Sequence, residues 1–143
     1  DKFIGRGVLL DVRYESNIKY KGEYSNMIEE EDIVLLFTGH SDRYGTKEYY
    51  TEQPVIDKEL ANFFVQKNIK MLLIELLLIM DLPSPDNYPF EIHKILFANN
   101  ILIIENLTNL SELVAVKNFN VIAFPLKIRA EASMVRVVAC IQI

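Results

Sequence analysis

Cysteine and histidine are scarce in this sequence, which has a single cysteine, Cys140, and two histidines among 143 residues. One cysteine excludes both a disulfide framework and a cysteine zinc site within one chain. The N-terminal segment also lacks the basic region and the apolar core of a secretory signal peptide. We therefore expect a protein of the reducing cytoplasm.

Basic residues and long apolar runs are scarce as well. The 15 Lys and Arg residues are outnumbered by 20 Asp and Glu residues, and the net charge is −5. Because no basic stripe is interleaved with aromatic residues, nucleic acid is not an expected partner. The almost wholly apolar stretch MLLIELLLIM, at 71–80, is far shorter than the ~20 residues of a membrane span. We assign this stretch to the protein core and expect no membrane partner.

The sequence does contain a large apolar fraction arranged in alternating strand and helix patterns. Half of its residues are hydrophobic, enough for one domain, 1–143, with a substantial core. Short apolar runs closed by polar residues or glycine predict buried strands, and apolar residues at helical spacing predict helices. The fold class is therefore mixed α/β. The predicted strands are 7–12, 32–39, 101–104, 119–128 and 135–143, and the predicted helices are 57–68 and 90–100.

Two local patterns carry more specific expectations. Asp57 stands where the N-cap of a helix belongs, and Leu60, Ala61 and Phe64 follow at helical spacing. The acidic cluster at 29–32 lies just before a predicted strand, and we expect it to be a solvated surface.

Several polar residues cluster near the ends of neighbouring predicted elements. The segment DLPSPDNYP is a rigid loop, since its three prolines preclude regular structure, and it carries Asp81, Ser84 and Asp86. His93 follows on a helix and Glu105 ends an apolar strand. Sites of α/β proteins are usually built at such places. The His–Glu spacing of twelve fits no general metal motif, so spacing alone favours a core histidine and a capping glutamate over a shared metal ion.

A family resemblance changes this balance. Four stretches of the sequence resemble, in order, the second half of the cyclase-like metal-dependent hydrolases. They are IEEEDIVLLFTGHSDRYGT, DLPSPDNYPFEIHKILF, IIENLTNL and VIAFPLKI…VRVVA. This family includes bacterial kynurenine formamidase and isatin hydrolase. The most specific part is the histidine in a short helix followed by ENLTNL, because the family uses that histidine and that glutamate as metal ligands. The corresponding residues are His93 and Glu105.

The resemblance implies a swivelling β/β/α fold, one or two divalent ions (zinc or manganese), and hydrolysis of an amide or lactam bond by metal-activated water. It makes Asp81, Ser84 and Asp86 candidate substrate-side residues. His40, in TGHSDRYGT, stands where family members often carry an aromatic residue. We interpret His40 as a surface or substrate-side residue, with a structural role favoured. Aromatic residues in the loops either form an aromatic wall for an aryl amide or pack in the ordinary way. They are Tyr44, Tyr49, Tyr50, Tyr88 and Phe90.

The departures from the family pattern limit these expectations. The histidine-rich stretch H-x-G-T-H-x-D-x-P-x-H, which supplies the family's other ligands and a catalytic histidine, is absent from the sequence. We expect it upstream of Asp1, so the fold should be incomplete at its N-terminus and the chain alone inactive, with its catalytic residues unknown. Relative to the family pattern, about five residues are added within 71–80. The alternative is a non-catalytic, self-associating α/β domain or a truncated, inactive member of the family. Strands left without neighbours favour a homodimer in either case.

Overall fold

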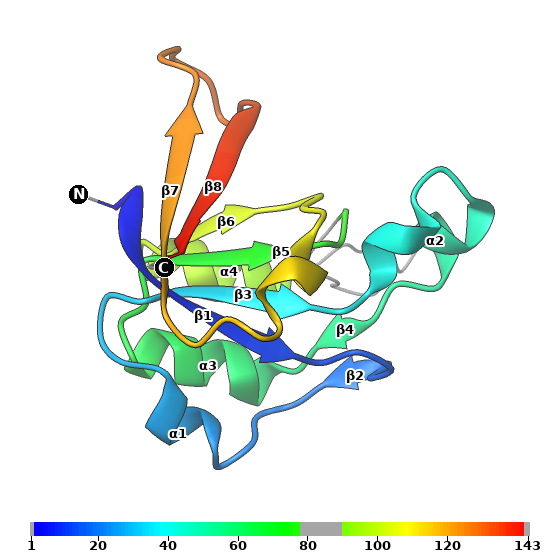
Figure 1. Cartoon of the computed structure of the whole chain (residues 1–143), viewed down its shortest axis with the longest axis horizontal. Coiled ribbons are helices and arrows are strands. Elements are labelled where there is room, and N and C mark those ends of the chain that lie inside the picture. The colour runs from blue at the N-terminus through cyan, green and yellow to red at the C-terminus, as the bar shows by residue number, and fades with distance from the viewer. Residues whose placement is uncertain (1, 78–89, 142–143) are drawn as a thin grey trace.

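The computed structural model describes residues 2–77 and 90–141. Its main feature is a six-stranded mixed sheet with the strand order β6-β5-β3-β1-β7-β8 (Figure 1). The neighbours from β6 to β1 pair in parallel, whereas β7 pairs antiparallel with both β1 and β8. The strands are β1 (Ile4–Asp11), β3 (Ile33–Phe37), β5 (Met71–Ile74), β6 (Leu102–Ile104), β7 (Phe119–Pro125) and β8 (Val135–Ile141).

The parallel part of the sheet is buried on both faces. On one face, α3 (Lys58–Gln66) and α4 (Glu91–Ala98) pack against alternate strand residues such as Val34 and Leu36 of β3. The intervening residues of β3, among them Leu35, face a second core formed with β7 and the 3₁₀ helix η2 (Leu110–Leu113). Successive side chains of a strand point to opposite faces. A strand buried on both faces is therefore apolar throughout, as the sequence of β3 is.

The predicted strands and helices are confirmed in kind and order, with shifted ends. The first strand begins earlier than expected and the helix at 57–68 is shorter at both ends. Asp57 caps that helix as expected, since its Oδ1 accepts a hydrogen bond from the Glu59 amide at 2.7 Å. The last two strands form an antiparallel hairpin, which projects away from the parallel strands (Figure 1).

Several short elements were not predicted. Two-residue strands β2 (Asn17–Ile18) and β4 (Val55–Ile56) form a separate parallel pair. The other short elements have too few residues for a hydrophobic period to show. They are α1 (Tyr24–Met27), the 3₁₀ helix η1 (His40–Arg43) and α2 (Lys47–Thr51).

The expectation of a solvated surface at 29–32 is wrong for Asp32, which is 2% exposed. Its carboxylate accepts hydrogen bonds from Arg6 Nε at 2.9 Å, Arg6 Nη2 at 2.6 Å and the Glu29 amide at 2.7 Å. A buried carboxylate requires such partners. The hydrogen bond to Asp32 in turn raises the pKa of Arg6.

The apolar run at 71–80 is core from 71 to 76, and Leu77 is half-buried. Residues of β5 are fully buried, and Glu75 and Leu76 beyond the strand are 1% and 0% exposed. The remainder of the run, and the candidate residues Asp81, Ser84 and Asp86, lie outside the described residues. Within 2–77 and 90–141, no helix is long and apolar enough to cross a membrane.

Candidate functional site

Polar residues follow three neighbouring parallel strands at the same edge of the sheet. Thr38 follows β3, Glu75 follows β5 and Glu105 follows β6. Parallel strands bring their carboxyl ends to one edge, where open α/β sheets commonly bind ligands. The edge therefore gathers two acidic residues from separate parts of the sequence.

The structure brings His93 and Glu105 together. His93 lies on α4, and its Nε2 atom is 3.5 Å from Oε1 of Glu105. Their side chains are 16% and 27% exposed, so both are partly covered yet open to solvent on one side. Glu105 directly follows a strand and caps no helix, which removes the capping interpretation of this residue.

Two phenylalanine rings flank the imidazole of His93. The ring of Phe90 meets it edge-on at a centroid distance of 5.7 Å, and that of Phe97 is tilted at 5.8 Å. Both phenylalanines are exposed, at 41% and 55%. Phe90 thus lies beside the candidate site, as an aromatic wall requires, but the contact is equally that of ordinary packing around a histidine.

A tight turn after β6 fixes the backbone on which Glu105 stands. Asn106 adopts a left-handed conformation with φ of 58°, which asparagine tolerates better than most residues. Its amide donates to the Leu76 carbonyl at 2.9 Å, and the Leu107 amide donates to the Ile74 carbonyl at 3.0 Å. These bonds tie the turn to the end of β5.

Glu75 is the other acidic residue at this edge; unlike Glu105 it is buried, and the sequence did not point to it. Its Oε2 accepts hydrogen bonds from the Thr38 amide, the Thr38 hydroxyl and the Gly39 amide at 2.9, 3.0 and 2.7 Å. Its Oε1 accepts from the Ser41 hydroxyl at 2.8 Å. Four donors satisfy the carboxylate, so Glu75 holds the loop after β3 and is not an open ligand. A single carboxylate within the run MLLIELLLIM was the available signal, since a buried charge needs partners.

His40 is not a surface residue, because only 5% of it is exposed. Its Nε2 atom is hydrogen-bonded to the carbonyl oxygen of Tyr49 at 2.9 Å, and its ring stacks on the Tyr49 ring at 5.1 Å. The structural role that the sequence favoured for His40 therefore holds. Tyr49 itself is buried, whereas Tyr44 and Tyr50 pack edge-on against it and are exposed. Tyr88 lies outside the described residues.

The His93–Glu105 pair fits part of a divalent metal site. An imidazole nitrogen and a carboxylate oxygen are ligands that both Zn²⁺ and Mn²⁺ accept. A catalytic zinc site normally has three protein ligands and an open position. Among the described residues, no group of three or more histidine, cysteine, aspartate or glutamate side chains is placed to hold a metal ion. The pair can supply two ligands, and a complete site needs at least one more.

Two cavities stand out among the described residues, and one of them lies at this edge of the sheet. One of about 430 Å³ lies at the carboxyl ends of β1 and β3 and is lined by Arg13, Thr38, His40 and Arg43, among others. Each arginine is paired with an acid, Arg13 with Asp11 and Arg43 with Glu52. The basic charge in this cavity is therefore largely matched.

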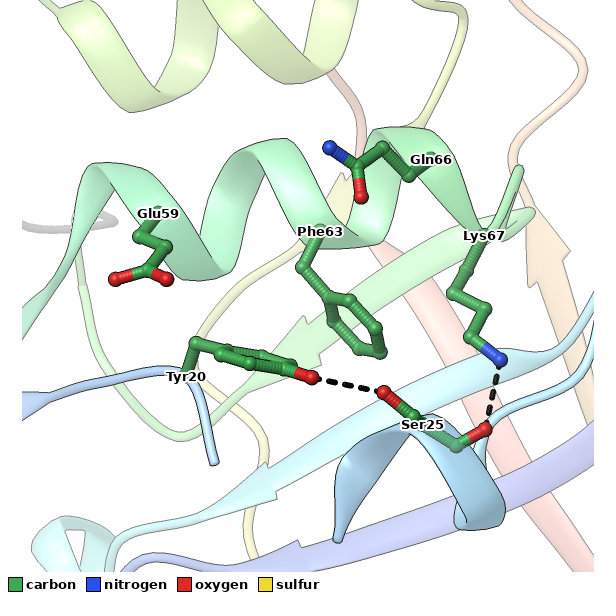
Figure 2. A pocket seen from close by; sticks show the side chains of 6 residues that line it. All are labelled: Tyr20, Ser25, Glu59, Phe63, Gln66 and Lys67. Carbon is green, nitrogen blue, oxygen red and sulfur yellow. Dashed lines mark hydrogen bonds between the residues drawn. The ribbon is translucent and has the colours of Figure 1, made fainter. Parts of the chain in front are cut away.

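The other cavity, of about 390 Å³, lies between α3 and the α1 segment (Figure 2). Lys67 Nζ donates to the Ser25 carbonyl at 2.8 Å, and the Tyr20 and Ser25 hydroxyls are 2.8 Å apart. The Tyr20 ring packs on Phe63 at 4.7 Å. These contacts fasten α1 to α3, on the helix-covered face rather than at the edge that carries His93 and Glu105.

Residues 1–79 match the sequence model of a family described as "Putative cyclase". This chain belongs to the cyclase family. The match includes Glu75 and Tyr49 but ends before His93 and Glu105. An uncharacterized protein of Methanocaldococcus jannaschii is 40% identical over 110 residues, which are 76% of this chain and 53% of that protein. The chain thus spans about half the length of this curated relative.

Solved structures share the fold of this chain. Isatin hydrolase A from Ralstonia solanacearum is 19% identical with a TM-score of 0.83, over 99% of this chain and 61% of its own. A "predicted metal-dependent hydrolase" from Bacillus stearothermophilus is 25% identical with a TM-score of 0.76, over 96% of this chain and 63% of its own. A "potential metal-dependent hydrolase with cyclase activity" is 24% identical with a TM-score of 0.75, over 95% and 64%. These likenesses confirm the cyclase-like fold that the sequence predicted.

Proposed function

We propose that this chain is part of a metal-dependent hydrolase that cleaves amide or lactam bonds, in the manner of an arylformamidase. The observation that carries the proposal is the convergence of His93 and Glu105, whose donor atoms lie 3.5 Å apart at the carboxyl edge of the sheet. Two atoms that bind one ion at about 2.0–2.2 Å must lie within about 4.4 Å of each other. Membership of the cyclase family and the likeness to isatin hydrolase support the same reading.

In this proposal His93 Nε2 and a carboxylate oxygen of Glu105 hold one divalent ion, zinc or manganese. When bound, such an ion polarises a carbonyl oxygen and lowers the pKa of coordinated water toward neutrality. The flanking Phe90 and Phe97 rings restrict the rotation of the imidazole and keep water from part of its surface. Glu105 contributes the negative charge that an imidazole does not.

We further propose that other ligands of the metal belong to a histidine-rich segment that these 143 residues do not contain. The sequence has only His40 besides His93, and His40 is bonded to Tyr49. The chain alone should consequently bind metal more weakly than micromolar and show no hydrolase activity.

Calorimetric titration of the chain with Zn²⁺ and with Mn²⁺ tests this assignment. We expect weak binding that is lost in His93→Ala and in Glu105→Gln. Glu112→Gln is the matched control, because it removes an exposed carboxylate on η2 and should leave binding unchanged. Equal binding by His93→Ala and the unchanged chain would contradict the proposed ligands. Submicromolar binding abolished by His93→Ala would instead mean that this chain holds a complete site.

The substrate class requires a protein that contains the histidine-rich segment as well as this chain. Hydrolysis of N-formylkynurenine, isatin and simple cyclic amides should be compared in one assay series. Turnover of one of these, lost with the metal and in His93→Ala, supports the proposal. Absence of both metal binding and turnover favours the alternative of a non-catalytic, self-associating domain.

A further inference from the structure

Tyr49 connects three parts of the edge that carries the proposed metal ligands. It lies on α2 and is 1% exposed. Its hydroxyl donates to Oδ1 of Asn106 at 2.5 Å and lies 3.2 Å from the Glu75 carbonyl oxygen. Its own carbonyl oxygen is bonded to the His40 ring. The single side chain thus joins α2, the end of β5 and the turn after β6.

The contact with Asn106 matters because Asn106 directly follows Glu105. The left-handed conformation of Asn106 turns the chain immediately after Glu105. Two backbone amides of this turn donate hydrogen bonds to carbonyl oxygens at the end of β5, and the Asn106 side chain accepts one from the Tyr49 hydroxyl. The backbone that presents Glu105 is therefore fastened both to the sheet and to α2.

The surroundings of Tyr49 keep its hydroxyl in the protonated form that this contact requires. Burial raises the pKa of the Tyr49 hydroxyl, with smaller contributions from Tyr44, Tyr50, Glu105 and Glu75. The hydroxyl consequently stays protonated and remains a donor at neutral pH.

From this arrangement we infer that Tyr49 is a positioning residue for Glu105, acting through Asn106. The inference rests on the proposed function, since it gives Glu105 a metal to bind. Partners beyond the direct ligands of a metal site orient those ligands, and their loss typically weakens metal affinity 10- to 100-fold. Tyr49 makes no direct contact with the metal in this scheme.

A double-mutant cycle on the full chain tests the inference. Tyr49→Phe removes the hydroxyl and keeps the ring that packs on His40. Asn106→Gly removes the acceptor and keeps a residue that adopts positive φ without strain. Mn²⁺ affinity is measured from the EPR signal of free Mn²⁺. We expect each variant to bind about tenfold more weakly, and the double variant also about tenfold more weakly, because both changes break one contact.

Tyr50→Phe is the matched control, since Tyr50 is on the same helix but 54% exposed. It should bind Mn²⁺ as the unchanged chain does. Losses that multiply to about a hundredfold in the double variant would overturn the inference, because the two residues would then act separately. An unchanged affinity in Tyr49→Phe would also overturn it while leaving the proposed ligands in place.

Amide hydrogen exchange separates this inference from the proposed function. In Tyr49→Phe without metal, we expect the Asn106 and Leu107 amides to exchange about fivefold faster, with Leu35 and Leu36 unchanged. If the unchanged chain binds no Mn²⁺, the assignment of His93 and Glu105 as ligands loses its support, and exchange alone decides whether Tyr49 fixes the turn. Equal exchange at Asn106 and Leu107 in both chains would overturn the positioning role.

Discussion

Buried polar side chains fix the local structure through the hydrogen bonds that they make. In the part of the chain that the structure describes, the buried charged residues Asp32 and Glu75 each accept several hydrogen bonds, and buried His40 is bonded to a carbonyl oxygen. A buried polar group without partners costs about 1–3 kcal/mol, which explains why these groups are matched. The buried hydroxyl of Tyr24 is different, because no hydrogen-bond partner lies within reach among the described residues.

Stability at alkaline pH should depend on Tyr24. Burial raises the pKa of its hydroxyl above 10, although the nearby Lys21 offsets part of the rise. The raised pKa means that the folded state favours the neutral phenol of Tyr24 over the phenolate. The resulting contribution to stability is fully present below the ordinary tyrosine pKa of about 10 and is lost as the pH rises through the raised pKa of the folded state. In urea denaturation at pH 8, the free energy of unfolding of Tyr24→Phe should equal that of the unchanged chain or exceed it by up to about 1 kcal/mol. This difference should grow above pH 10.

Tyr14→Phe is the control for this comparison, since Tyr14 is 96% exposed and should follow the unchanged chain at both pH values. A Tyr24→Phe variant that loses more than 1 kcal/mol at pH 8 would mean that the hydroxyl has a stabilising partner after all.

The residue scale is also where sequence reasoning reached its limit. The donors of Glu75 lie on the loop after β3, more than thirty positions earlier in the chain. A pattern of neighbouring residues contains no information about such a pairing. Asp32 was misassigned for the same reason, because its partner Arg6 comes from β1. His93 and Glu105 could be selected only through a family resemblance, since their spacing alone indicated nothing.

At the scale of elements, local patterns were sufficient to predict most of the sheet. Strands buried on both faces are continuous apolar runs, and an amphipathic helix with a capping aspartate, such as α3, carries its own signals at 57–68. The pair β2 and β4 could not be predicted, because two residues in each strand give no period. Their pairing depends on tertiary contacts rather than on propensity.

Close packing between β1 and β7 leaves no room for a side chain at Gly7. A Cβ at Gly7 would lie 2.1 Å from Cε2 of Phe119, whose ring is buried in the core on that face. Gly7→Ala should therefore lower the free energy of unfolding by about 1–3 kcal/mol, measured by urea denaturation.

Gly22→Ala provides the comparison, since no atom lies within 4 Å of a Cβ at that position and little change is expected. Adding Phe119→Leu to Gly7→Ala should recover part of the loss. A Gly7→Ala variant as stable as Gly22→Ala would contradict the close approach of the two strands.

At the scale of the whole molecule, apolar residues remain exposed on the projecting hairpin and beside it. Ile4, Phe124 and Val138 are 45%, 58% and 40% exposed, and β8 is the last strand of the sheet. An exposed strand edge with apolar side chains favours association. We propose that two copies of the chain associate through β8 and these residues.

Light scattering at micromolar concentration should accordingly give about twice the mass of 16.6 kDa. Val138→Lys should shift the protein toward the monomer, because a charged side chain on an edge strand opposes pairing. Val114→Lys replaces another exposed valine, 49% exposed and directly after η2, and should remain a dimer. A monomeric unchanged chain would rule out this association.

The position of β1 between β3 and β7 has a consequence for how the chain folds during synthesis. Ile4 pairs with Ile122, whereas the other edge of β1 pairs with β3, beginning at Ile33. A ribosome releases the N-terminal part first, so β1 can join β3 early while its second edge waits for β7. Long-range pairing of this kind is slow. In the interval between the synthesis of β3 and that of β7, therefore, one edge of β1 exposes unpaired backbone groups, which can pair with another strand until β7 covers them.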